Sequence, residues 1–360
     1  MNSRIQCDIV IPVVDQMLLT KQCVESIFAC TDSPYRLILV DNGSADKTRV
    51  YLESLKDTSN TVTILKNDYN KGWIKGVNQG IGASLSDYVC VMNNDTIVRT
   101  QGWLSKMIAL AEAEPTVGLI NPRFDLKDEG SSLGEPFMEV DFCRGYCILI
   151  KRDVIKKIGL FDEAYGVGYY DDDDYSVRAI QAGFRCVQVR EVFVEHLKDT
   201  TFSSLFGKRW MRNLHEKNKL LFYSKWGRRL RLLFIVNGTK QREKNLSDIL
   251  FSLARRQHIL YIWNLGERLR INHSNVREKI YRFDLPPIYF IAKIISNRMR
   301  KREKRFDAVF VEEGAPLEIP GIVGNAYRFT LKNDEGGIMK IVETMTAGTK
   351  KESREALELF

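Results

Sequence analysis

The sequence lacks a long hydrophobic run, a metal-type spacing of cysteines and the common phosphate-binding loops. No apolar stretch approaches the roughly 20 residues that a membrane-spanning helix needs, and the polar start at Met1–Cys7 is not typical of a secretory signal. The seven cysteines are an odd number without zinc-ligand spacing, so we expect reduced thiols in a cytoplasmic protein. There is no Walker loop, no convincing G-x-G-x-x-G run and no local signature of a nucleophilic Ser or Cys triad.

The composition is nevertheless that of a folded chain. Hydrophobic residues make up 44% and charged residues 28% of the 360 positions, which is enough apolar material for a core. These proportions exclude global disorder, collagen and a small fold that depends on disulfides. The length indicates one large domain with an addition, or two domains.

Charge is distributed unevenly along the chain. The net charge is +8, but residues 201–310 hold 26 Lys and Arg against 8 Asp and Glu, whereas the remaining residues hold 28 against 38. Such a basic segment fits peripheral attachment to an anionic membrane, nucleic-acid binding, or a helix surface that is solvated or packed against the acidic part. We favour the first and third explanations equally over nucleic acid, because charge patterns alone are unspecific.

The first hundred residues alternate between short apolar runs and stretches with helical spacing. Four runs are typical of buried strands: Cys7–Val14, Arg36–Val40, Thr61–Leu65 and Tyr88–Met92. Because helix-like segments separate them, the pattern predicts βαβ units and an α/β fold, with a mainly parallel sheet flanked by helices. A further strand is predicted at Val140–Ile150, after a polar loop at residues 125–136.

The pattern changes after about residue 202. Basic amphipathic helices are predicted at Phe206–Tyr223, Leu230–Val236, Asn245–Trp263 and Ile288–Lys304. Near the end, the runs Ala326–Leu331 and Ile338–Glu343 predict a hairpin. We therefore divide the chain into an α/β domain at residues 1–225, a basic helical region at 226–306 and a small C-terminal segment at 307–360.

Polar residues follow three of the predicted strands at the point where each strand ends. Asp41-Asn42 follows the second strand, Asn93-Asn94-Asp95 follows the fourth, and a third cluster follows the strand at Val140–Ile150. Ligands of open α/β sheets bind beyond the carboxyl ends of the strands, so these clusters indicate a binding site. A single residue of this kind is more often part of a turn or a helix cap, and only the set favours a site.

The same positions carry a resemblance to a known family. The runs that resemble the nucleotide-binding half of family-two glycosyltransferases are IVIPVVDQ at 9–16, VDNGSAD at 40–46, NDYNKGW at 67–73 and VMNNDT at 91–96. Further runs are similar to the second half of that domain: GYCILI at 145–150, GLFDE at 159–163, YDDDDYSVR at 170–178 and AGFR at 182–185. The resemblance extends from Ile9 to Tyr223. It implies the GT-A fold and the use of nucleotide-activated sugars, and the Asn-x-Asp form at 93–95 is similar to the rhamnosyl- and galactofuranosyl-transferase branch.

The resemblance also implies a divalent metal that bridges the two phosphates of the donor and offsets the charge on the departing nucleoside diphosphate. The usual Asp-x-Asp motif is here Asn93-Asn94-Asp95, so we expect Asp95 to supply the carboxylate ligand, with Asn93 and Asn94 beside the donor. His196 stands where the family often has a late histidine and is a candidate second ligand, although a lone histidine at a strand end is usually structural. Such ligands suit Mn²⁺ or Mg²⁺.

Other residues are expected to contact the donor. Asp41 is expected to accept a hydrogen bond from a uracil or thymine base, or from ribose, and its alternative role is to cap the following helix. Pro12 and Val13 are expected beside the base or the ribose, mainly through their backbone. The next wall of the donor site, whose alternative role is ordinary loop structure, is expected from Asn70, Gly72 and Asn78.

Four consecutive carboxylates, Asp171–Asp174, precede a predicted helix. Helix N-termini favour carboxylates, so some of the four are expected to be electrostatic caps. Sugar transfer by direct displacement needs a base for the acceptor hydroxyl, and crowding of like charges raises the pKa of a carboxyl so that it can serve. The family's Glu-Asp pair assigns this role to Asp172, with Asp171 in the place of the glutamate and as the alternative base. Candidates for a sugar-stacking surface are Trp73, Tyr169 and Tyr170.

Together these features predict an inverting glycosyltransferase that moves a hexose or deoxyhexose from a UDP- or dTDP-sugar to a hydroxyl group. We expect the acceptor to be a growing surface glycan or a lipid-linked glycan of polysaccharide biosynthesis. The enzyme is expected to be cytoplasmic or peripheral at the inner face of the membrane. The alternative is a catalytically idle nucleotide-sugar-binding or scaffold protein, which the missing first acid of the metal motif favours.

Overall fold

The computed structural model describes residues 7–58, 61–123, 136–197, 207–237, 243–256, 258–265, 280–283, 305–314, 325–330, 335–358 and 360. By their contacts the residues fall into two compact units, Met1–Lys219 and Leu220–Phe360. Two predicted features lie outside the described residues, namely the helix at Ile288–Lys304 and all of the polar loop except Pro136.

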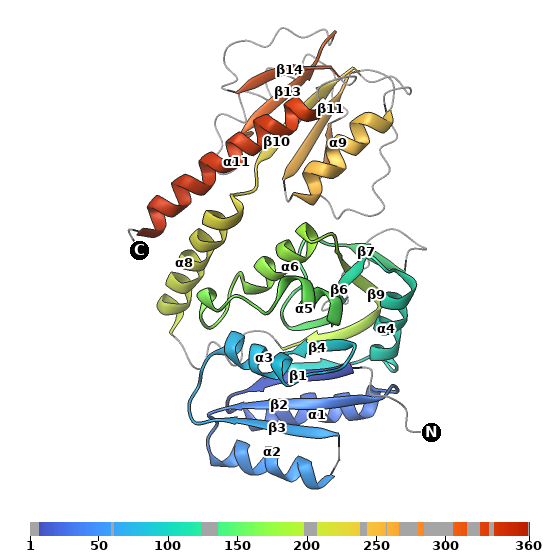
Figure 1. Cartoon of the computed structure of the whole chain (residues 1–360), viewed down its shortest axis with the longest axis vertical. Helices are drawn as coiled ribbons and strands as arrows, with labels where there is room; N and C mark the ends of the chain where they lie inside the picture. Colours follow the sequence, from blue (N-terminus) through green and yellow to red (C-terminus); the bar gives the residue numbers. More distant parts are fainter. Residues whose placement is uncertain are drawn as a thin grey trace. The chain divides into compact units, whose positions relative to one another are not determined.

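A nine-stranded sheet forms the first unit (Figure 1). Its strands are β1 (Cys7–Val13), β2 (Tyr35–Asn42), β3 (Val62–Asn67), β4 (Tyr88–Met92), β5 (Thr96–Val98), β6 (Val117–Arg123), β7 (Phe137–Glu139), β8 (Cys147–Lys151) and β9 (Arg185–His196). They run in the order β3-β2-β1-β4-β8-β6-β9-β5, with β7 paired to β9. The first four strands pair in parallel, which confirms the βαβ prediction, and β8 lies antiparallel between β4 and β6. Because β2 lies on one side of β1 and β4 on the other, the winding of the chain reverses at β1.

Helices cover both faces of this sheet (Figure 1). They are α1 (Met17–Cys30), α2 (Asp46–Thr58), α3 (Trp73–Gly82), α4 (Trp103–Ala113), α5 (Arg152–Ile158), the 3-10 helix η1 (Glu163–Tyr165) and α6 (Asp171–Gln181). One face packs against α1, α2 and α4 in a continuous apolar cluster. The opposite face carries α3, where Gly76 and Gly80 leave room for Pro12 and Val10 of β1. This close approach brings the start of α3 to the carboxyl end of β1.

The strand predicted at Val140–Ile150 is interrupted. β7 and β8 are separate strands with different partners, and residues 140–146 between them form an irregular segment. Asn121 of β6 holds this segment, because its side-chain amide donates to the Arg144 carbonyl oxygen at 3.0 Å and accepts from the Arg144 N–H. Gly145 breaks the apolar run, and a glycine inside a strand pattern often marks such an irregularity.

A five-stranded parallel sheet forms the second unit, in the order β12-β11-β10-β13-β14. Its strands are β10 (Arg231–Val236), β11 (Ile259–Asn264), β12 (Ile280–Phe283), β13 (Ala308–Glu312) and β14 (Ala326–Phe329). An apolar cluster on one side of the sheet includes residues of α9 (Glu243–Arg255) and α11 (Glu335–Glu358). A further helix, α8 (Lys208–Trp226), begins in the first unit and ends in the second.

Three predictions for the C-terminal region are corrected by this sheet. The expected helix at Leu230–Val236 is β10, because a short apolar run that is buried on both faces belongs between two parallel strands. The expected helix at Asn245–Trp263 divides into α9 and β11. The expected hairpin is β14 followed by α11, whose first turn includes Gly336 and Gly337. The basic helix predicted at Phe206–Tyr223 is present as α8, but the rest of the described C-terminal region is organised by strands that the periodicity did not reveal.

All seven cysteines lie in described segments as free thiols, and six of them are buried. Burial raises the pKa of the Cys23 thiol to about 12, so this cysteine is a packing residue and not a nucleophile. In the described part of the chain, no helix combines the length and the hydropathy that a membrane crossing requires.

Candidate active site

A cavity of about 570 Å³ lies at the carboxyl ends of β1 and β4 in the first unit. This is the crevice in which the reversal of winding at β1 predicts a ligand. Predicted site residues that line it are Pro12, Val13, Asn70, Gly72, Trp73, Asn93, Asn94, Asp95, Tyr169, Tyr170, Asp171, Asp172 and His196. Residues distant in the sequence thus meet at one place, as the strand-end argument requires.

Asp95 and His196 meet on one side of the cavity. β5 and β9 pair antiparallel with Thr96 opposite His196, and this register brings the histidine to the residue that follows Asn94. The distance from Asp95 Oδ1 to His196 Nε2 is 3.3 Å. The imidazole stacks on the Tyr146 ring at 5.3 Å between centroids, so its plane is fixed.

Tyr146 is itself held in one orientation. Its hydroxyl donates to the Pro122 carbonyl oxygen at 2.6 Å, and its backbone carbonyl accepts from the Asn93 N–H at 2.9 Å. Burial raises the pKa of the Tyr146 hydroxyl well above its usual range, so the hydroxyl keeps its proton and remains a donor. The tyrosine therefore supports His196 and Asn93 together.

The two possible metal ligands, the Asp95 carboxylate and the His196 imidazole, fit a divalent cation. One carboxylate and one imidazole match the few protein ligands that Mn²⁺ or Mg²⁺ needs when substrate phosphates supply the others. Asn93 is less available, because its Oδ1 accepts from Trp73 Nε1 at 2.8 Å. Among the described residues there is no group of three acidic, His or Cys side chains placed to hold a metal.

Asp171 and Asp172 form another wall of the cavity, at the start of α6. Asp172 is oriented by two backbone N–H groups, since its Oδ2 accepts from Gly145 at 2.8 Å and its Oδ1 from Asp173 at 2.9 Å. Asp171 is buried with 4% of its surface exposed. Burial and the neighbouring Asp172 charge raise the pKa of Asp171 well above its usual value. The pair thus combines an oriented carboxylate with one that holds its proton more strongly.

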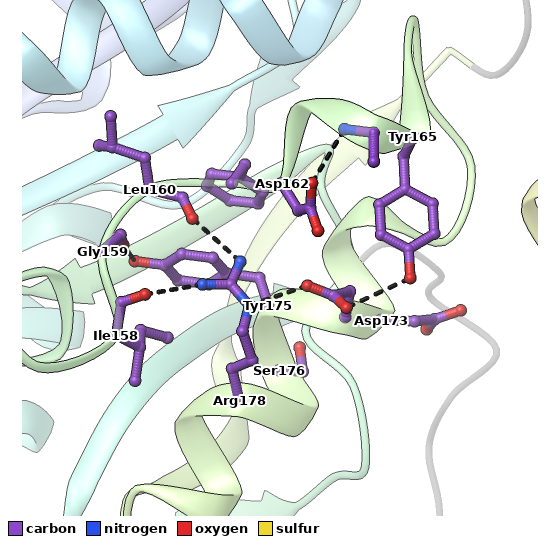
Figure 2. Close-up of polar contacts among 12 residues, drawn as sticks. Ile158, Gly159, Leu160, Asp162, Tyr165, Asp173, Tyr175, Ser176 and Arg178 are labelled. Carbon is purple, nitrogen blue, oxygen red and sulfur yellow. Dashed lines mark hydrogen bonds and ion pairs between the residues drawn. The ribbon is translucent and has the colours of Figure 1, made fainter. Parts of the chain in front are cut away.

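The fourth carboxylate, Asp174, does not line the cavity and has a structural role. Arg178 Nε donates to Asp174 Oδ2 at 2.8 Å. Its other nitrogens donate to the carbonyl oxygens of Ile158 and Leu160 at 2.8 and 2.9 Å (Figure 2). The Tyr165 hydroxyl donates to the second Asp174 oxygen at 3.2 Å. These contacts tie the first turn of α6 to the segment before η1, which fixes where the first three carboxylates project.

The loop before α6 has an unusual backbone. Tyr169 and Tyr170 both have positive φ angles, 69° and 67°, in the left-handed region that side chains rarely adopt. Asn218 of α8 holds this loop, because its amide donates to the carbonyl oxygens of Tyr165, Gly168 and Tyr169 at 2.7, 2.7 and 3.2 Å. Strained backbone of this kind persists where the surroundings enforce it, and it often accompanies a functional site.

The predicted donor wall is rigid through a network of amides. Asn70 Oδ1 accepts from Asn42 Nδ2 at 3.1 Å and from the Gly72 N–H at 2.9 Å. Gly72 has a φ of 88°, and a Cβ there would lie 3.0 Å from a Val167 methyl group, so only glycine fits well. Pro12 and Val13 lie at the end of β1 next to this network, and Asn94 is anchored to Thr20 at 3.0 Å.

Two predicted donor contacts, Asn78 and Asp41, are not among the lining residues. Asn78 exchanges hydrogen bonds with the Phe161 backbone at 2.9 and 3.0 Å, so its amide joins α3 to the segment before η1. Asp41 accepts from the Ser44 N–H at 2.9 Å and lies 3.7 Å from Arg49 Nε. The contacts of Asp41 match its alternative turn role, whereas Asn78 links α3 to another segment, and donor contact by either residue stays a prediction.

The lining residues that sequence reasoning missed include three with polar side-chain groups, Arg144, Tyr146 and His215. The first two lie where a continuous strand was expected, and Gly145 between them was the available signal. His215 lies on α8 and packs against the rings of Tyr169 and Tyr170 at 5.4 and 5.3 Å between centroids. Nothing in the basic pattern of α8 distinguishes this histidine.

Comparisons with known proteins agree with this geometry. Residues 8–136 match the family model described as glycosyl transferase family 2. These residues form a glycosyl transferase family 2 domain. The mannosyltransferase PcManGT from Pyrobaculum calidifontis, solved in complex with GDP-Man and Mn²⁺, matches the structure with a TM-score of 0.51 at 16% identity, over 62% of this chain and 64% of that chain. At this identity the likeness concerns the fold, and the family 2 domain has the GT-A-like fold that the sequence predicted.

Relatives of the family 2 domain are found in several bacteria. An uncharacterized protein of Sinorhizobium fredii, y4gI, is 25% identical over 209 residues, which cover 50% of this chain and 23% of the relative. The pre-mycofactocin glycosyltransferase of Mycobacterium tuberculosis is 28% identical over 169 residues, which cover 42% of this chain and 35% of the relative. The chain therefore spans about a quarter to a third of the length of these two relatives.

Proposed function

We propose that the first unit, which contains the family 2 domain, is an inverting, metal-dependent glycosyltransferase. It would move a hexosyl or deoxyhexosyl group from a UDP- or dTDP-sugar to a hydroxyl acceptor. The observation that carries this proposal is the placement of Asp95 with His196 and of Asp171 with Asp172 around one cavity. The first pair suits the leaving diphosphate and the second suits the attacking hydroxyl. The complex of PcManGT with GDP-Man and Mn²⁺ supports a nucleotide-sugar donor and a divalent metal, but not the choice of nucleotide base.

Asp95 and His196 would hold the cation in this proposal. A divalent ion bound there supplies positive charge that offsets the charge developing on the departing nucleoside diphosphate. The chain's own part is to aim the two ligands, through the β5–β9 register and the Tyr146 stack.

Asp172 is the base in this proposal. Its carboxylate takes the proton of the acceptor hydroxyl while the acceptor oxygen bonds to the anomeric carbon. The bond from that carbon to the phosphate oxygen breaks, and the nucleoside diphosphate leaves with the bonding electron pair. Attack from the side opposite the leaving group inverts the anomeric configuration. The Gly145 and Asp173 N–H groups hold the carboxylate in place during this step.

For the acceptor we propose a glycan or a lipid-linked glycan, reached at an anionic membrane surface. The support is the first turn of α8, where Lys208, Arg209 and Arg212 are exposed beside Trp210, whose exposed fraction is 43%. Cationic side chains next to an exposed tryptophan are typical of segments that lie at a membrane interface. Co-sedimentation with vesicles that contain anionic lipid, and its loss with neutral vesicles, tests this part.

The experiment for the reaction is a nucleotide-sugar panel with the purified chain and Mn²⁺. We expect release of nucleoside diphosphate with a UDP- or dTDP-sugar, and a loss of about 1,000-fold in Asp172→Asn with donor binding retained. The matched control is Asp153→Asn, because Asp153 is a surface aspartate of α5 whose side chain is 76% exposed. Retention of full transfer by Asp172→Asn would move the base to Asp171.

A catalytically idle sugar-nucleotide binder is the second candidate, because Asn93 replaces the first metal acid and its oxygen is engaged by Trp73. This candidate predicts metal-dependent donor binding by calorimetry without any product. Turnover in the same preparation eliminates it.

A further inference from the structure

Arg144 gives the cavity a positive charge that the proposed reaction does not use. It is the only lysine or arginine among the described residues that line the cavity, and its side chain is exposed. Within the described chain, no carboxylate lies within ion-pair distance of its guanidinium. The cavity is therefore lined by Asp95, by three consecutive aspartates of α6 and by one arginine. This arginine forms no ion pair with a carboxylate of the described residues.

The backbone of Arg144 is fixed where it enters the cavity. Asn121, which is 2% exposed on β6, accepts from the Arg144 N–H and donates to the Arg144 carbonyl oxygen at 3.0 Å. Both backbone groups of Arg144 thus bind the side chain of one buried residue. With the backbone fixed, only the Arg144 side chain has to be ordered when a ligand binds.

The chain order places Arg144 next to the base. Gly145 donates its N–H to Asp172, and Tyr146 stacks on His196. The segment therefore passes from Tyr146, beside the proposed metal ligand His196, through Gly145, which binds the proposed base Asp172, to Arg144. In a direct displacement the acceptor lies on the side of the base, opposite the leaving diphosphate, and Arg144 adjoins the residue that binds the base.

We propose that Arg144 binds an anionic group, a carboxylate or a phosphate, on the acceptor. This inference rests on the proposed glycosyltransferase function and names the class of its acceptor. A guanidinium matches both anions through two parallel hydrogen bonds. It also offsets the repulsion that the aspartates of α6 exert on an anionic acceptor.

The experiment compares acceptors in the full-length chain. Octyl glycosides are supplied in matched neutral, carboxylated and phosphorylated forms, with the donor that turns over. We expect the wild type to prefer an anionic form, and whether that is the carboxylate or the phosphate identifies the source of the charge. In Arg144→Gln the KM for that acceptor rises about 10- to 100-fold, while kcat and the KM for the donor stay within twofold. The neutral acceptor is unaffected.

Two further variants make the result specific. Arg144→Lys keeps the charge without the planar fork and is expected to fall between wild type and Arg144→Gln. Arg354→Gln on the exposed surface of α11 is the matched control and leaves every constant unchanged. Circular dichroism and thermal unfolding confirm that each variant is folded.

Three outcomes would overturn the proposal. A loss of affinity for UDP in Arg144→Gln would assign the arginine to the donor phosphates. An equal loss of affinity for neutral and anionic acceptors would give Arg144 a structural role. If the wild type shows no preference for an anionic acceptor, an anionic group on the acceptor is excluded as the ligand of Arg144. Failure of the glycosyltransferase function is different, because the wild type would then release no nucleoside diphosphate from any donor.

Discussion

The two units place acids at opposite edges of their sheets. In the first, Asp95 follows β4 at the carboxyl edge, where it lines the cavity of about 570 Å³ and faces the imidazole of His196. In the second, Asp307 precedes β13 at the amino edge and binds the guanidinium of Arg228, which is permanently charged. A cavity of about 330 Å³ borders this second pair, but there the acid is already neutralised by the chain. The edge and the partner distinguish a ligand site from a structural contact.

The first unit repeats this contrast within one sheet. Asp8 lies at the amino end of β1 with none of its surface exposed, and it accepts two hydrogen bonds from Arg36 at 2.9 Å and one from Ser84 at 2.6 Å. Burial alone would raise the pKa of Asp8, but the hydrogen bonds from Arg36, Ser84 and Ser86 lower it below its usual value. Asp8 at the amino edge therefore stabilises the fold, whereas Asp95 at the carboxyl edge lines the cavity.

The largest expected effect is the loss of the carboxyl-edge acid. Asp95→Ala should reduce sugar transfer about 1,000-fold, or about 4 kcal/mol, because it removes the carboxylate proposed to hold the cation. Calorimetry with Mn²⁺ and UDP should show the loss of metal-dependent binding independently of activity. If Asp95→Ala binds the metal as the wild type does, Asp95 is not the proposed metal ligand and the contrast with the amino-edge acids fails. Asp153→Asn is the control.

Removal of the amino-edge acid should affect stability. Asp8→Ala leaves Arg36 without its buried partner, and we expect the free energy of unfolding to fall by about 3 kcal/mol. Hydrogen exchange of the β1 and β4 amides measures this loss in the first unit alone. If the amides keep wild-type protection, Asp8 does not have the structural role that its contacts imply.

The same residue gives a pH dependence with a defined sign. Because the folded-state pKa of Asp8 is lowered, its contribution is complete above the unfolded-state pKa of about 4 and is lost as the pH falls through the lower folded value. The free energy of unfolding of the wild type should therefore decline below about pH 4 more steeply than that of Asp8→Asn. Denaturant unfolding at several acid pH values measures the two slopes, and parallel slopes would contradict the assignment.

The amino-edge acid of the second unit should behave in the same way with a smaller effect. Asp307→Ala removes the partner of Arg228 and the acceptor of the Arg231 N–H at 2.8 Å. Because Arg228 is about one third exposed, we expect a loss of about 2 kcal/mol, seen as faster hydrogen exchange in β10 and β13. Exchange in β1 and β4 is the internal control, and faster exchange there as well would contradict an effect limited to the second unit.

Much of the first sheet could be predicted because its strands obey simple rules. Tyr88–Met92 is an apolar run that matches β4 residue for residue, and the polar residues that follow it line the cavity as expected. The distinction between Asn94, which lines the cavity, and Asn78, which binds Phe161, was not predictable. Asn94 follows β4 directly and Asn78 lies within α3, and in each case the tertiary partner decides the role of the amide.

The second sheet shows where periodicity fails. Leu230–Val236 is short and apolar, and such a run fits a buried strand or a buried helix equally well until its neighbours are known. Arg144 was missed for a related reason, since the break between β7 and β8 depends on hydrogen bonds from Asn121 on another strand. Long-range contacts of this kind leave only the weak local signal of Gly145.

The smallest expected effect is a gain in stability at the active site. Burial and the Asp172 charge raise the folded-state pKa of Asp171, so the unfolded chain ionises first and the free energy of unfolding falls as the pH rises above about 4. Asp171→Asn removes this cost and should raise the stability of the first unit at pH 7 by about 1 kcal/mol, while sugar transfer declines. Thermal unfolding at pH 4 and pH 7 tests this, because the gain should be present at pH 7 and small at pH 4. A loss of stability at pH 7 would mean that Asp171 stabilises the start of α6, and this cavity-lining acid would then be structural in the way that Asp8 is at the amino edge.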